Sequence, residues 1–156
     1  MVNVSPAFME AIKQPVVTYK LTGTIGTHNF SEDNIVEGTC HISHQCTNSD
    51  EIVLGSSYMG KFEATFTGIN ISRYNWYLKM IVPTFQLKLL NGSYEAIEMG
   101  VYIVKEVKHS AEGTHVVAYD RMVKFGRKFM HSRYDYIAKP YTFLSQLCSE
   151  CDVTLD

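Results

Sequence analysis

The stretch Ile97–Phe129, IEMGVYIVKEVKHSAEGTHVVAYDRMVKFGRKF, predicts two apolar strands around a tight turn at Glu112-Gly113. Apolar residues recur at every second position in both halves, which is typical of a strand with one buried face. The second strand continues to Tyr119, after which Asp120 is placed to cap a short basic helical turn through Lys124–Phe125. We therefore expect a β-ribbon closed off by a helical turn. Nothing in the stretch has the residue order of a catalytic loop.

Turn residues divide the rest of the chain into further short apolar runs. Asn91-Gly92 is the clearest hairpin turn, because both residues tolerate positive φ. Pro83 lies inside the extended run Lys79–Leu90, which predicts an edge position or a bulge. The other expected strands are Val16–Leu21 (followed by a turn at Gly23–Gly26), Ile35–Cys46, Ile52–Leu54, Tyr58–Ile69, Tyr94–Met99, Val101–Lys108 and Thr114–Tyr119.

Helices are expected near the two ends of the chain. Ser5-Pro6 combines a favourable N-cap with a proline at the first helical position, and Pro15 ends that helix. Pro140 precedes a second expected helix at Thr142–Glu150. The chain is therefore predicted to be mainly β: an antiparallel, barrel-like tube domain with short flanking helices.

Composition agrees with one β-rich domain. The chain has 156 residues, of which 46% are hydrophobic and 12% aromatic, enough for a substantial core. The sequence predicts no signal peptide and no apolar run of the ~20 residues that cross a bilayer. The formal net charge of -2 argues against a nucleic-acid-binding protein held mainly by its overall field. The charge is uneven, however, since the charged residues among residues 1–60 are mostly acidic and those of Arg121–Lys139 are mostly basic.

The cysteines and nearby histidines are the candidate metal ligands. Cys148 and Cys151 form a C-x-x-C pair on a predicted helix rather than on the tight turn of a zinc knuckle. A second group consists of Cys40, His41, His44 and Cys46. Strand alternation places His41 on the face opposite to the other three. We therefore expect no metal and no cofactor, with all four thiols free in a protein made in a reducing compartment.

The six histidines are scattered and form no catalytic motif. His109 and His115 flank one hairpin turn, where they are placed to face each other. The sequence contains no nucleophile elbow, no zinc-protease helix and no dinucleotide-binding glycine loop. We expect no catalytic residue, no enzymatic activity and no small-molecule substrate.

The basic segment Arg121–Lys139 is a candidate binding site. It interleaves Phe125, Phe129, Tyr134 and Tyr136 with cations, a combination that suits single-stranded nucleic acid. Two other interpretations remain open: an amphipathic turn with its rings in the core, and a basic rim that contacts an acidic protein partner. The candidate interface residues are Arg121, Lys124, Arg127, Lys128 and Arg133.

Three regions of the chain, taken together, resemble a known protein family. The first is Gly38–Cys46 (GTCHISHQC) followed by Asp50–Gly55 (DEIVLG). The second is Glu98–Val104 (EMGVYIV), a small turn into an apolar strand, and the third is Ala118–Phe125 (AYDRMVKF), a strand-to-helix step. In order and spacing, nearly the whole chain resembles the N-terminal tube-like domain of the tail hub (tail-associated lysin, tail-tip) proteins of siphophages and prophages.

The resemblance implies a structural component of a phage or prophage tail tip. Members of this family form a trimeric hub, in which two tube-like domains per protomer present a pseudo-sixfold ring beneath the hexameric tail tube. They contact the distal tail protein, the tail tube and the tape measure protein. The chain is accordingly expected in the virion tail tip, assembled in the bacterial cytoplasm and independent of membranes. The alternative from another class is a single-stranded nucleic-acid-binding β barrel.

The resemblance also implies how the chain is divided. Residues 1–156 correspond to a single tube-like domain, expected to be the N-terminal part of a longer protein, and residues 141–156 to a helix leading toward the next domain. A homotrimer is expected of the full-length protein. From charge alone, the acidic first part and the basic Arg121–Lys139 are candidates for complementary ring contacts. Such assembly would cover the edges of the long strands.

Overall fold

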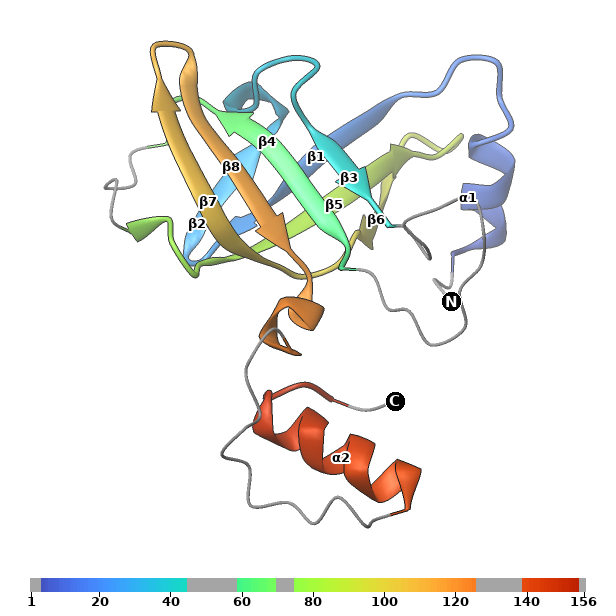
Figure 1. Cartoon of the computed structure of the whole chain (residues 1–156). Coiled ribbons are helices and arrows are strands. Elements are labelled where there is room, and N and C mark those ends of the chain that lie inside the picture. The colour runs from blue at the N-terminus through green and yellow to red at the C-terminus, as the bar shows by residue number, and fades with distance from the viewer. Residues whose placement is uncertain (1–3, 45–58, 70–74, 126–138, 155–156) are drawn as a thin grey trace, which may run out of the picture.

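A computed structural model describes residues 4–44, 59–69, 75–125 and 139–154. Two α-helices flank a β-rich body that also contains short 3-10 turns (Figure 1). The elements are α1 (Pro6–Ala11), β1 (Tyr19–Ile25), β2 (His28–Ser31), η1 (Glu32–Asn34), β3 (His41–Ser43), β4 (Lys61–Phe66), β5 (Met80–Lys88), β6 (Tyr94–Glu98), β7 (Tyr102–Ser110), β8 (Gly113–Tyr119), η3 (Arg121–Phe125) and α2 (Pro140–Glu150).

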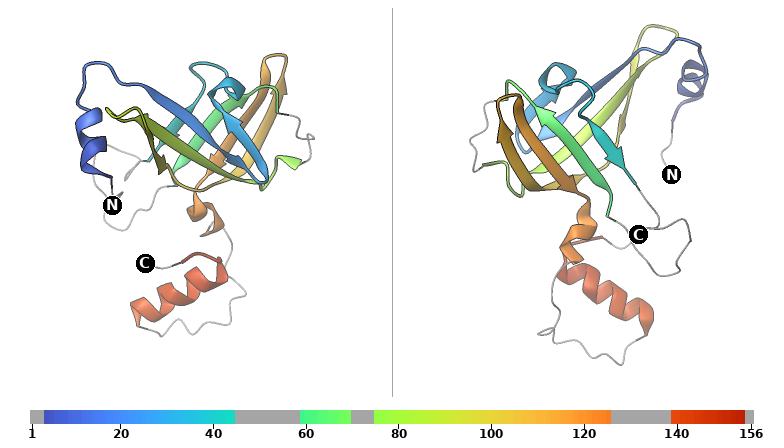
Figure 2. Two further views of the ribbon diagram at one scale, coloured as in Figure 1. Left: turned by 180° about the vertical axis from the view of Figure 1, so that it is seen from behind. Right: turned by 45° about the horizontal axis from the view of Figure 1, so that its top comes forward.

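All strand pairs of the described residues are antiparallel and belong to one eight-stranded sheet. The strand order is β2-β1-β5-β7-β8-β4-β3, and β6 pairs with β5 beside this path. The prediction of a mainly antiparallel β fold with short flanking helices is confirmed. The sheet curls around its core (Figures 1 and 2), but it is not closed into a barrel, because β2 and β3 at its two ends do not pair with each other.

Both predicted hairpins form. Asn91-Gly92 joins β5 to β6, with φ +84° at Gly92 and the Asn91 side chain accepting a hydrogen bond from the backbone N–H of Ser93 at 2.9 Å. The turn between β7 and β8 lies one residue earlier than predicted, since Ser110 pairs with Gly113. Gly113 is therefore the first residue of β8, where a Cβ would lie 2.4 Å from the carbonyl oxygen of Phe66.

The first strand was predicted too early in the chain. β1 begins at Tyr19 and runs through Gly23 to Ile25, and only Gly26 lies in the following turn, with φ +59°. Gly23 is required by packing rather than by a turn. A Cβ there would lie 2.4 Å from the carbonyl oxygen of Val82 and 2.6 Å from the ring of Phe30.

The predicted long strand Ile35–Cys46 is interrupted. Ile35 forms an isolated bridge with Phe66, the chain then turns away at Gly38 (φ +76°), and regular pairing resumes only in β3. The Thr39 hydroxyl accepts a hydrogen bond from the backbone N–H of Thr65 at 3.1 Å. At this interruption a side-chain oxygen therefore takes the place of a backbone carbonyl as the partner of β4. The expected strand Tyr58–Ile69 shortens to β4. Residues 45–58, which include the expected strand Ile52–Leu54, lie outside the described residues.

Pro83 does not lie on an edge strand, because β5 pairs with β1 on one side and with β6 and β7 on the other. Its carbonyl oxygen accepts a hydrogen bond from the backbone N–H of Met99 at 2.8 Å. The N–H and C=O of one strand residue point to the same side, so the donor that proline lacks would also point to this side. The ladder is interrupted there between β6 and β7, which makes the missing donor inexpensive.

Two groups of buried apolar side chains hold the body together. The larger lies inside the curled sheet and includes Trp76 and Tyr102. Pairs of its aromatic rings are in contact, with distances of 5.2 to 5.7 Å between ring centroids. The smaller lies where Phe8 and Ala11 of α1 pack against Leu87 of β5. No helix within the described ranges is long and apolar enough to span a membrane.

The helix starts follow the predicted capping chemistry. The Ser5 hydroxyl accepts a hydrogen bond from the backbone N–H of Phe8 at 3.1 Å, and Pro6 is the first residue of α1. The Ser5 backbone N–H also donates to the Glu95 carboxylate at 2.9 Å, which fixes α1 to β6. In α2, Pro140 is the first helical residue, so this helix begins two residues before the predicted Thr142.

Replacing Gly23 with alanine is expected to lower the free energy of unfolding by about 3 kcal/mol, because β1 lies too close to β5 and Phe30 to admit a methyl group. Gly38→Ala is the matched control, since a Cβ at Gly38 would meet no atom within 4 Å. Backbone strain alone is then expected to cost about 1 kcal/mol. Urea unfolding measures both variants, and equal losses would contradict the role assigned to crowding at Gly23.

Candidate functional site

The basic segment is described in part. Arg121 and Lys124 lie on η3, directly after β8, whereas Arg127, Lys128 and Arg133 lie outside the described residues. The Lys124 ammonium donates to the side chain of Asp152 at 2.8 Å and to its backbone carbonyl at 2.9 Å. This ammonium therefore joins η3 to the residues after α2.

A cavity of about 410 Å³ lies between the body and the C-terminal residues. Met80 and Ile103 contribute its apolar wall, and Arg121 lines it from η3. Hydrogen bonding to the Lys124 ammonium lowers the pKa of Asp152. Of the five predicted interface residues, the structure thus places two beside this cavity, and one of these two is bonded within the chain.

The candidate metal ligands lie in separate places. Cys148 and Cys151 are buried at the C-terminal end of α2, while Cys40 is half-buried against the main core. All three are free thiols, and burial raises the pKa of Cys40. Cys46 lies outside the described residues. Within the part of the chain that is described, no three His, Cys, Asp or Glu side chains are grouped closely enough to hold a metal ion.

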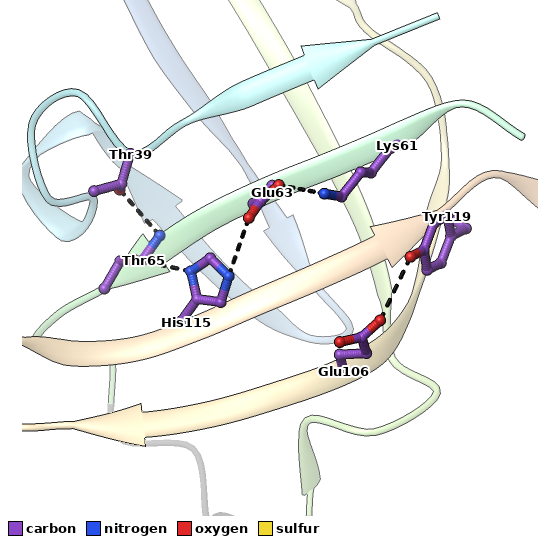
Figure 3. Close-up of polar contacts among 7 residues, drawn as sticks. All are labelled: Thr39, Lys61, Glu63, Thr65, Glu106, His115 and Tyr119. Atoms are coloured by element: carbon purple, nitrogen blue, oxygen red, sulfur yellow. Dashed lines mark hydrogen bonds and ion pairs between the residues drawn. The ribbon is translucent and has the colours of Figure 1, made fainter. Parts of the chain in front are cut away.

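A polar cluster on the outer face of β4 and β8 was not predicted (Figure 3). Its centre is the carboxylate of Glu63, which pairs with the ammonium of Lys61 and, at 3.2 Å, with Nε2 of His115. On the other side of the ring, His115 Nδ1 lies 3.3 Å from the Thr65 hydroxyl. Beside this group, the Tyr119 hydroxyl donates to Glu106 at 3.5 Å.

The charges around Glu63 lower the pKa of its carboxyl group. The hydrogen bond from Lys61 is the largest cause, and the charges of Lys61, His115 and His41 act in the same direction. His115 reaches Glu63 because it lies opposite Thr65 in the register and Lys108 on its other side. The prediction that His109 faces His115 is therefore wrong, since His109 instead lies opposite Thr114.

The order hydroxyl, imidazole, carboxylate in Thr65, His115 and Glu63 is that of a nucleophilic triad. The Thr65 side chain is nevertheless covered, with 8% of the residue exposed, and it lies in a direct cross-strand pair with His115. A nucleophile must be open to its substrate. The geometry therefore favours cross-strand stabilisation of the sheet. From the sequence, the alternation along β4 would indicate which side chains point outward. It would not indicate that β8 is the strand whose side chains they contact.

A second cluster lies at the end of the body from which η3 leaves. The hydroxyl of the fully buried Tyr102 donates to the carbonyl oxygen of Met99 at 2.9 Å and lies 2.7 Å from Nε2 of His44. Because the single hydroxyl proton is directed to Met99, the Nε2–H tautomer of His44 fits as donor to the Tyr102 oxygen. Burial, and then the nearby Asp120 charge, raise the pKa of Tyr102.

Asp120 fastens the same end of the body to β4. One carboxylate oxygen accepts a hydrogen bond from the Gly60 backbone N–H at 2.7 Å, and the other accepts from the Met122 N–H at 2.9 Å. The predicted cap of the helical turn is thus confirmed. A Cβ on Gly60 would lie 2.7 Å from the His44 ring and 3.0 Å from the Asp120 carboxylate. We call this group the Tyr102 cluster; it consists of His44, Gly60, Met99, Tyr102 and Asp120.

Comparison with protein-family models, curated proteins and solved structures gives no match. The resemblance found in the sequence therefore stays a prediction, and the assignment of function depends on the geometry described above.

Replacing Glu63 with glutamine is expected to lower the free energy of unfolding by about 0.5 kcal/mol at neutral pH, as for other partly exposed ion pairs. The pKa of Glu63 is lower in the folded state, so its charge stabilises the fold above the unfolded-state value and ceases to do so as pH falls through the folded value. The difference from the unsubstituted protein should therefore vanish in acid. Glu112→Gln, in an exposed turn, is the control. A deficit that is the same at neutral and acidic pH would contradict the ion-pair origin.

Proposed function

We propose that the chain is a structural, non-enzymatic module of a phage or prophage tail tip. In this proposal it forms part of a ring beneath the tail tube and contacts the distal tail and tape measure proteins. The full-length protein assembles as a trimer. Assembly takes place in the bacterial cytoplasm, and the finished protein belongs to the virion.

The Tyr102 cluster is the observation that supports this proposal most strongly. The three regions on which the family resemblance depends are far apart in the sequence, yet each contributes to it: His44 from the first, Met99 and Tyr102 from the second, and Asp120 from the third. Residues that share a structural task in this way supply a physical reason for the order and spacing of the three regions. The cluster thus supports one coherent family pattern over three unrelated coincidences.

The surface also suits a protein that works within an assembly. α1 and the β5–β6 hairpin lie side by side (Figure 2). Large apolar side chains are exposed on α1, on the residues that follow it and in the hairpin turn: Met9, Ile12, Val16 and Leu90. Val16 is 83% exposed and Leu90 66% exposed. Large apolar side chains that stay in water on two neighbouring elements suit contact with another protein. In addition, β2 and β3 end the sheet with unpaired edges among the described residues.

The proposal predicts that charge reversal in the basic segment weakens assembly without unfolding the domain. The variant Arg127→Glu, Lys128→Glu, Arg133→Glu should bind the tail tube and distal tail proteins of the same virion at least about tenfold more weakly, and the loss of affinity should be larger at low salt. Its melting temperature should stay close to that of the unsubstituted protein, so that a loss of binding is not a loss of folding. Analytical ultracentrifugation measures the association.

The matched control makes the same change in charge elsewhere. Lys79→Glu, Lys105→Glu, Lys108→Glu reverses three cations, one directly before β5 and two on β7, outside α1 and the β5–β6 hairpin, and should leave tail-protein binding unchanged. Failure of the unsubstituted protein to bind any tail protein would reject the proposal. Tight, salt-sensitive binding of single-stranded oligonucleotides would instead favour the nucleic-acid alternative.

A further inference from the structure

The first three residues of β1 have a free edge. β2 pairs with Thr22–Ile25 and ends there, whereas β5 pairs with the whole of β1. Among the described residues, Tyr19, Lys20 and Leu21 therefore pair with β5 alone. This is the side on which the curled sheet stays open.

Backbone donors and acceptors point into this opening. The Lys88 N–H donates to the carbonyl oxygen of Thr18 at 2.9 Å, which makes Thr18 and Lys88 a hydrogen-bonded pair. In an antiparallel ladder such pairs alternate, so Lys20 directs its N–H and C=O toward β5. Tyr19 and Leu21 must then direct theirs to the open side. This arrangement is what an added antiparallel strand requires.

A cavity lies on each face of the free edge. The cavity on the core side, about 290 Å³, is lined mainly by apolar residues, among them Leu21, Ile35 and Cys40, with Glu32 and Glu37 beside them. The cavity on the outer side, about 260 Å³, is lined by polar residues that include Lys20, Asp33 and Gln86. Successive side chains of a strand point to opposite faces, so a strand placed here would direct one side chain into each cavity in turn.

The charge around the opening favours a cationic occupant. Glu32 lines both cavities, Asp33 lines the outer one and Glu37 the inner one, and all three are exposed. The one cation of this group, Lys20, lies over the ring of Tyr94, 4.9 Å from its centroid. An incoming lysine or arginine would therefore meet carboxylates.

We propose that the Tyr19–Leu21 edge accepts an extended segment of a partner protein as an additional strand. That segment alternates apolar side chains, which enter the inner cavity, with lysine or arginine, which face the carboxylates of the outer one. It continues the line of β2 along β1 and narrows the opening of the sheet. The inference depends on the free edge, the two cavities and their charge, and it holds whether or not the chain belongs to a tail tip.

The test uses a fluorescent peptide of about nine residues that alternates valine and lysine, with its binding followed by anisotropy. A peptide that alternates valine and glutamate is the control for charge. We expect saturable binding of the lysine peptide, weakened as salt rises, and at least tenfold weaker binding of the glutamate peptide. Glu32→Gln with Asp33→Asn neutralises the two carboxylates that line the outer cavity and should weaken binding of the lysine peptide several-fold.

A proline pair locates the site. Leu21→Pro removes a donor that points into the opening and leaves the ladder to β5 intact, so peptide binding should fall about tenfold, the equivalent of one hydrogen bond. Ala96→Pro is the matched control. It places proline on the free edge of β6, where by the same alternation Ala96 directs its N–H away from β5. This variant should bind the peptide normally.

Three results would overturn the proposal: no binding to the unsubstituted protein at about 1 mM peptide, equal binding of both peptides, or loss of binding in Ala96→Pro but not in Leu21→Pro. Circular dichroism checks that Leu21→Pro is folded. If it is not, the Glu32→Gln, Asp33→Asn variant decides, because both of the side chains it changes are exposed and lie outside the core.

Discussion

The hydroxyl group of Tyr102 is the point on which the arrangement of the sheet depends. The ring fills the core beside Phe62, but its polar tip must be satisfied where it is buried. Met99 and His44 supply the two partners, and this fixes the turn into β7 and the end of β3 relative to each other. Asp120 then holds β4 and η3 at the same place through backbone donors. Four separate parts of the chain are thus set by one group of short polar contacts.

The β5–β6 hairpin is held in a different way. There α1 covers a small apolar cluster on β5, and Ser5 ties the helix to Glu95. The sheet stays open between its first and last strands, β2 and β3. A sheet edge of this kind attracts further strands, so that it must be blocked or used. An assembly protein can use it, and the free edge of β1 and the proposed tail-tip role therefore fit one another without depending on one another.

Helix caps and hairpin turns could be predicted from the sequence more accurately than the contacts that form between strands. Ser5, Asp120 and Asn91-Gly92 act through atoms within a few residues, and all three were predicted correctly. Gly23 was taken as a turn signal, because the ring of Phe30 that requires a glycine there approaches across the sheet. The Glu63–His115 pair could not be foreseen, since it needs the register between β4 and β8. Three of the predicted interface residues lie outside the described residues, and for these the sequence remains the one source.

A double-mutant cycle between His44→Ala and Tyr102→Phe tests the central role of the Tyr102 cluster most directly. Each single variant removes one partner of the contact, and urea unfolding gives the free energy for both and for the pair. We expect a coupling energy of about 1 kcal/mol, as for side chains in contact, while Tyr102→Phe combined with the distant Glu95→Gln should be additive. Additive losses for His44 and Tyr102 would show that the regions are not joined through this contact, and would contradict the account.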